Sequence, residues 1–108
     1  MAKIKSSEEF IALCKQWIAD YYNSHCEKTD KADITPNAVY VVWYAKALQN
    51  HKGLFSTTQP DGMYYEATYN GDKNEIYFDA YKKWENVCMS VVVTDNYEYD
   101  LEEEWKEF

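Results

Sequence analysis

The stretch Val39-Tyr40-Val41-Val42-Trp43 decides the fold, because five β-branched or aromatic residues in succession favour an extended strand. A two-residue alternation continues to about Gln49, and we predict one strand over this whole segment. The pattern leaves one alternative open, a helix with Thr35 as its N-cap and Pro36 at its first position.

Further strands are predicted after this segment, separated by residues that favour turns. Asn50-His51 is typical of a tight turn, and Pro60-Asp61-Gly62 combines a preset φ with a residue that tolerates positive φ. Residues 70–74 form a hairpin loop. The predicted strands are Lys52 to Thr57, Met63 to Tyr69, Glu75 to Lys83 and, as an optional fifth, Val87 to Val93.

A helix is predicted on each side of these strands. Ser6 and Glu9 have the spacing of a capping box, and apolar side chains follow at helical spacing, which predicts an amphipathic helix over about residues 7–25. A polar linker covers residues 27–33. Near the C-terminus, Asp100 and Glu103 repeat the capping spacing, and a short acidic helix is expected to carry Leu101, Trp105 and Phe108.

The predicted class is therefore α+β: an N-terminal amphipathic helix packed on a four- or five-stranded antiparallel meander, with a short acidic C-terminal helix. Residues 1–93 are expected to form a single domain, and residues 94–108 an acidic C-terminal segment. Strand alternation assigns these side chains to the face under the helix: Val39, Val41, Trp43, Ala45, Met63, Tyr65, Ala67, Tyr69, Ile76, Phe78 and Ala80.

The opposite sheet face is expected to be rich in tyrosine. It would carry Tyr40, Tyr44, Tyr64, Tyr77 and Tyr81, together with Lys46, Glu66, Thr68, Asp79 and Lys83. Tyrosines on one face are typical of protein interfaces. They could also stack unpaired bases, although the face has no excess of positive charge to attract phosphate. Cover by the C-terminal helix or by a second copy of the chain is the third alternative.

The charge of this 108-residue chain is concentrated at its C-terminus. Residues 94–108 hold seven acidic residues against one lysine, a net charge of −6 out of −8 for the chain. Glu102, Glu103, Glu104 and Trp105 combine carboxylates with an aromatic anchor, a composition that suits a segment binding a basic partner. A solubilising end is the alternative. All 11 basic residues are lysine.

No catalytic, metal or cofactor site is predicted. His25 and Cys26 are neighbours at the expected helix end, where adjacent side chains diverge by about 100° and make a poor catalytic pair. Cys14 lies on the apolar stripe, and no paired spacing of cysteine or histidine indicates a metal. Glu66 and Asp79 are expected to face each other across a hairpin as charge partners of Lys46 and Lys83 rather than as a hydrolytic pair.

The chain is expected to be cytoplasmic. Three cysteines without a C-x-x-C pair favour reduced thiols. Carboxylates interrupt the N-terminal region where a signal peptide needs its apolar centre. No apolar run approaches the length of about 18 residues needed to cross a membrane.

Three segments carry a resemblance to a known family: Val39 to Lys52, Asp61 to Lys73 with its Tyr-Asn-Gly-Asp-Lys run, and Glu75 to Asn86. Residues 7–90 resemble a family of small uncharacterised proteins from phages and prophages of low-GC Gram-positive bacteria. The resemblance implies a phage-related setting and supplies no activity.

These observations together predict a non-enzymatic interaction protein of phage origin. Its expected partner is a host or phage protein, bound through the tyrosine-rich face and the acidic segment, with DNA mimicry or interference with a defence protein as the form of action. An accessory protein that binds single-stranded nucleic acid is the alternative.

Overall fold

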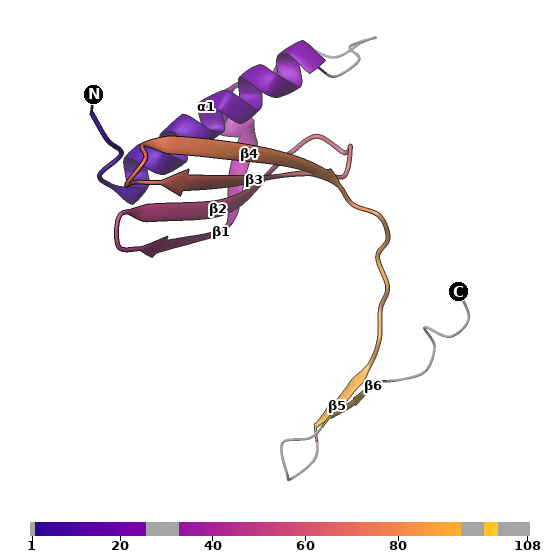
Figure 1. The fold of residues 1–108 in the computed structure, drawn as a ribbon. Coiled ribbons are helices and arrows are strands. Elements are labelled where there is room, and N and C mark those ends of the chain that lie inside the picture. Colours follow the sequence, from indigo (N-terminus) through magenta and orange to yellow (C-terminus); the bar gives the residue numbers. More distant parts are fainter. Residues whose placement is uncertain (1, 26–32, 94–98, 102–108) are drawn as a thin grey trace.

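The computed structural model describes residues 2–25, 33–93 and 99–101 and has one long helix packed on a four-stranded antiparallel sheet (Figure 1). The sheet order is β1-β2-β3-β4, and a separate two-stranded pair follows it in the sequence. The elements are α1 (Ser7–His25), the 3₁₀ turn η1 (Pro36–Ala38), β1 (Val39–Ala47), β2 (Asn50–Thr57), β3 (Met63–Asn70), β4 (Glu75–Lys82), β5 (Val91–Val93) and β6 (Tyr99–Leu101). The predicted α+β class is confirmed.

Helix α1 begins where the sequence predicts, at a reciprocal capping box. The Glu9 backbone N–H donates to Ser6 Oγ over 3.1 Å, and the Ser6 backbone N–H donates to Glu9 Oε1 over the same distance. The face of α1 that lies on the sheet buries Phe10, Cys14, Ile18, Ala19 and Tyr22. Leu13, which the helical spacing assigns to the apolar stripe, is 42% exposed.

The core lies between α1 and one face of the sheet. On the sheet side it contains Val39, Phe55, Tyr65, Ala67 and Tyr69, with Ile76 and Phe78 partly buried against them. The Trp17 ring stacks on the Phe78 ring with their centroids 3.9 Å apart. The alternation predicted for β3 and β4 therefore holds for these side chains, whereas Ala80 at the far end of β4 is exposed.

A β-bulge in β1 changes the face of every residue after it. Val41 pairs with Phe55 and Trp43 pairs with Leu54, so Val42 is an extra residue with no partner on β2. An extra residue shifts the two-residue alternation by one position. Tyr44, predicted to point outward, consequently lies on the helix side, where its ring is 5.6 Å from that of Phe10.

Because of the bulge, four side chains lie on the face opposite to the predicted one. Tyr44 and Lys46 pair with Gly53 and His51 on the helix side of the sheet, while Trp43 and Ala45 pair with Leu54 and Lys52 on the other side. The physical reason is that β1 is an edge strand, which has a neighbour on one side only and accommodates an extra residue at little cost.

Other sequence expectations are also corrected. The alternative helix over residues 39–49 is wrong, although Thr35 is the N-cap residue and Pro36 the first residue of the short turn η1. The first hairpin turns at Leu48-Gln49, so Asn50 and His51 already belong to β2. The fifth strand, β5, pairs with β6 and not with the sheet. The C-terminal helix is not seen: Tyr99–Leu101 is a strand, and the remainder of that prediction lies outside the described residues.

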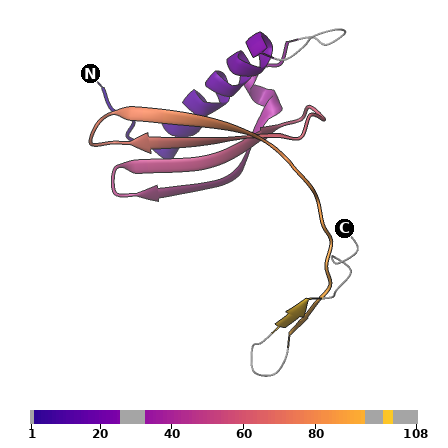
Figure 2. The ribbon, with the colours of Figure 1, turned by 45° about the vertical axis from the view of Figure 1, so that its right-hand side comes forward.

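After β4 the chain leaves the sheet and leads to the β5–β6 pair (Figures 1 and 2). Trp84 in this connection is 95% exposed, and the three valines of β5 are exposed as well. No helix in the described part of the chain is long and apolar enough to span a bilayer.

Candidate functional site

The sheet face opposite α1 is the candidate functional site, and we call it the open face. Its side chains are aligned in three rows that follow from the strand register: Tyr40, Ser56, Tyr64 and Tyr81; then Trp43, Leu54, Glu66 and Asp79; then Ala45, Lys52, Thr68 and Tyr77. In the described ranges no helix or strand covers this face (Figure 2).

Large aromatic side chains remain accessible on the open face. Tyr77 is 63% exposed, Tyr40 and Tyr81 are each 47% exposed, and Trp43 is 40% exposed. Tyr64 and Leu54 between them are half-buried. Four of the five tyrosines predicted for this face therefore lie on it, and Trp43 takes the place that the sequence assigned to Tyr44.

Glu66 organises the polar part of the open face. Its Oε1 accepts a hydrogen bond of 2.9 Å from the Tyr81 hydroxyl, and its Oε2 lies 3.6 Å from Lys52 Nζ. The hydrogen bond to Glu66 raises the pKa of Tyr81, and the charges of Glu66 and Asp79 act in the same direction. Asp79 is directly opposite Glu66 in the register, as predicted, but the lysine beside Glu66 is Lys52 rather than Lys46.

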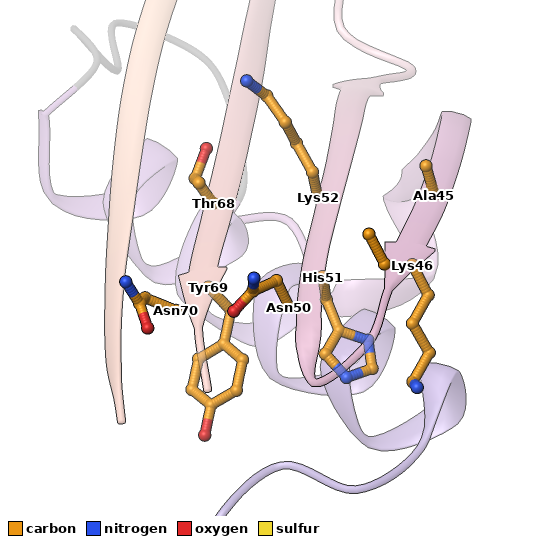
Figure 3. A pocket seen from close by; sticks show the side chains of 9 residues that line it. Ala45, Lys46, Asn50, His51, Lys52, Thr68, Tyr69 and Asn70 are labelled. Carbon is orange, nitrogen blue, oxygen red and sulfur yellow. The ribbon is translucent and has the colours of Figure 1, made fainter. Parts of the chain in front are cut away.

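A hollow of about 400 Å³ lies at the end of the sheet where the hairpins turn (Figure 3). Side chains of β1, β2 and β3 form its walls. The lining residues are Ala45, Lys46, Ala47, Asn50, His51, Lys52, Thr68, Tyr69 and Asn70.

Two contacts hold the β1–β2 and β3–β4 loops together at this end. The Gly71 backbone N–H donates to Asn50 Oδ1 over 2.9 Å, and the Gln49 side-chain amide donates to Asp72. A Cβ on Gly71 would lie 2.3 Å from the Gln49 carbonyl oxygen, so this close approach requires glycine.

His51 and Tyr44 form a polar pair at the same end, on the helix side. The Tyr44 hydroxyl lies 2.5 Å from His51 Nδ1, and His51 is 1% exposed. Burial lowers the pKa of His51, the charge of Lys46 lowers it further, and Glu9 acts in the opposite direction. Burial raises the pKa of Tyr44. The sequence placed His51 in a turn and gave no sign of this pair.

The residues tested for enzyme chemistry are not brought together. Cys14 is fully buried, and burial raises its pKa to about 12, so it lacks the thiolate character of a nucleophile. Cys88 is exposed in the connection after β4. His25 stacks on Tyr21, and Cys26 lies outside the described residues. Within residues 2–25 and 33–93, no three metal-ligating side chains form a group.

The predicted contacts Glu102, Glu103, Glu104 and Trp105 lie outside the described residues. Sequence reasoning missed Trp43, Leu54 and Lys52 as open-face residues. Trp43 was missed because the bulge contains no glycine to mark it. Leu54 and Lys52 were missed because no face was assigned to the predicted strand Lys52 to Thr57.

The fold and the open face define a small α+β domain with large aromatic side chains exposed on one sheet face. Residues 11–91, more than half of the chain, match the family of unknown function DUF6275, and the chain belongs to this family. The search of curated proteins gave no match. The search of solved structures gave none either.

Proposed function

We propose that this chain is a non-enzymatic interaction protein that binds another protein through its open face. The observation that carries the proposal is the set of large aromatic side chains, Tyr40, Trp43, Tyr77 and Tyr81, that remain accessible on one sheet face. Tyrosine and tryptophan supply large contact areas at low conformational cost and are enriched at interfaces. The half-buried Leu54 and Tyr64 give the centre of this surface an apolar base.

The charge of the open face favours a protein over a nucleic acid. The charged side chains in its three rows are Lys52, Glu66 and Asp79, and Lys52 is already paired with Glu66. Glu75, two residues before Tyr77 in β4, adds a further carboxylate at the edge of this face. A phosphate backbone would therefore release few counterions on binding. Aromatic platforms that bind single strands lie in cationic grooves, whereas the three rows of the open face hold one lysine against two carboxylates.

The acidic segment supports a partner with a basic surface. Residues 94–108 carry a net charge of −6, and opposite charge speeds association and limits binding to unsuitable partners. We include in the proposal that the chain is of phage origin, acts in the cytoplasm of a bacterial host, and occupies a basic cleft of a host or phage DNA-handling or defence protein as a DNA mimic.

A pull-down from a Gram-positive host lysate tests the proposal with three versions of the full chain. The double variant Tyr40→Lys/Tyr77→Lys changes two exposed open-face residues, and Leu13→Lys is the matched control on the exposed side of α1. We expect the wild-type chain and Leu13→Lys to retain one partner, and the double variant to lose at least about ten-fold in recovery, equivalent to about 1.4 kcal/mol. Equal recovery by all three would refute a role for the open face.

Two further measurements separate the alternatives. Light scattering on the purified chain should give a monomer; a stable dimer that Tyr40→Lys/Tyr77→Lys dissociates would make a second copy the partner. Titration with a single-stranded oligonucleotide should leave the tyrosine and tryptophan fluorescence unchanged at low salt. Quenching that disappears at high salt would favour nucleic-acid binding instead.

A further inference from the structure

A second cleft lies at the corner of the domain where the N-terminal segment meets the first hairpin. It has a volume of about 400 Å³ and is lined by Lys3, Ile4, Lys5, Lys46, Leu48, Gln49 and His51. Three of these are lysines from two separate segments, in a domain whose residues 1–93 carry more acidic than basic side chains. Positive charge is therefore concentrated here against the trend of the chain.

His51 provides a buried polar atom at this cleft with nothing to bond. Its ring stacks on Phe10 with centroids 5.3 Å apart, and its Nδ1 is taken by the Tyr44 hydroxyl. With that hydroxyl as donor, the neutral ring carries its hydrogen on Nε2. No group in the described part of the chain bonds to Nε2. A buried donor without an acceptor is energetically unfavourable, so an acceptor from outside the chain would be favourable.

Both walls of the cleft are held in place. The Ile4 backbone N–H donates to the Tyr69 hydroxyl over 3.2 Å, which fixes the N-terminal wall. On the other wall the Lys46 ammonium donates to the Leu48 carbonyl, and Leu48 itself has a φ of 57°, a left-handed conformation that is unfavourable for leucine. A site whose walls are already ordered loses little entropy when a ligand binds.

The carboxylate whose charge acts on His51, that of Glu9, is held in the cap of α1. Glu9 Oε1 accepts hydrogen bonds from the backbone N–H groups of Lys5 and Ser6, over 3.0 and 3.1 Å, as part of the helix cap. Because the Glu9 carboxylate already has these partners, the lysine ammonium groups of the cleft remain able to bind an anion from outside the chain.

We propose that this cleft binds an oxyanion, a phosphate or carboxylate group that accepts a hydrogen bond from His51 Nε2 and is neutralised by Lys3, Lys5 and Lys46. Lysine provides a point charge without the two-pronged geometry of arginine. Such a charge can neutralise either a phosphate or a carboxylate. The volume exceeds that of a bare ion and leaves room for the molecule that carries the group. Figure 3 shows the Lys46 side chain beside the His51 ring. The cleft is independent of the open face.

The test is an NMR titration of the full chain near neutral pH, at constant ionic strength, with inorganic phosphate in one arm, acetate in the second and chloride in the third. We expect saturable shifts at a millimolar dissociation constant, a range equivalent to about 4 kcal/mol of binding free energy. They should include a downfield shift of the His51 Nε2 proton. Saturation by phosphate alone assigns a phosphate ligand, and saturation by acetate as well extends the site to carboxylates.

Lys46→Met is the variant and Lys52→Met the matched control, since both lysines lie on the sheet and are exposed but only Lys46 lines the cleft. Loss of one charge contact should weaken binding about two- to five-fold in Lys46→Met and leave Lys52→Met unchanged. Shifts that grow linearly without saturation, that chloride reproduces, or that are equal in the two variants would overturn the proposal.

Discussion

The Tyr44 hydroxyl lies 2.5 Å from His51 Nδ1 on the helix side of the sheet, although simple alternation along β1 would place Tyr44 on the open face. The contact exists because Val42 is an extra residue in β1. One inserted residue therefore has two effects: it supplies a polar pair to the edge of the core, and it delivers Trp43 to the open face.

Removal of the Tyr44 hydroxyl should destabilise the protein. In Tyr44→Phe the buried Nδ1 of His51 loses its partner, at an expected cost of about 1–3 kcal/mol in the free energy of unfolding. Tyr40→Phe is the control, since Tyr40 is 47% exposed on the open face, and its change should stay within about 0.5 kcal/mol. Urea denaturation measures both. Equal stabilities for the two variants would show that the pair contributes nothing.

His51 should make stability depend on pH in a window that opens below about pH 6.5, its ordinary pKa. Burial and Lys46 lower its pKa in the folded state, with Glu9 opposing them, from an ordinary value of about 6.5 in the unfolded chain. As the pH falls, the unfolded chain binds the proton first. The contribution of His51 to the free energy of unfolding is therefore fully present above its ordinary pKa and is lost as the pH falls below it.

The measurement is the urea midpoint at several pH values in this window. His51→Gln should flatten the dependence, whereas His25→Gln, which removes the other histidine, should leave it as in the wild type. A slope that survives in His51→Gln would assign the effect to other groups.

Gly71→Ala should disturb the contact between the hairpin loops. The new Cβ would lie 2.3 Å from the Gln49 backbone oxygen, which cannot yield without moving the first hairpin, and the expected loss of stability is about 1–3 kcal/mol. Gly62→Ala is the comparison: its φ is 72°, yet its nearest neighbour is 3.8 Å away, so only the backbone conformation costs energy, about 1 kcal/mol. Thermal denaturation of both variants measures the difference. A Gly71→Ala protein as stable as the wild type would contradict this close approach.

The sequence was sufficient for features that depend on local chemistry. The capping box of Ser6 and Glu9, the helix over residues 7–25 and the hairpin at residues 70–74 follow from spacing and turn residues, and the structure confirms them. The faces of β3 also follow, because Tyr65, Ala67 and Tyr69 lie in a central strand with neighbours on both sides, where an extra residue would break two ladders.

The sequence was insufficient where the face of a side chain or the position of a turn depends on a tertiary contact. The bulge at Val42 lacks a glycine, and the burial of Tyr44 depends on Phe10 and His51 from other elements. The position of the first turn depends on Leu48 adopting a positive φ, which leucine rarely does. The open face was therefore predicted correctly in β3 and β4 and wrongly in the second half of β1.

A pair of lysine substitutions at adjacent positions tests the central claim, that the bulge puts Trp43 on the open face and Tyr44 on the helix side. Trp43→Lys should change the free energy of unfolding by no more than about 1 kcal/mol, since the lysine side chain stays in water. Tyr44→Lys should cost on the order of 3 kcal/mol, because it places a charge against Phe10 and on the same strand face as Lys46. Urea denaturation that ranks the two in this order supports the account, and the reverse order would contradict it.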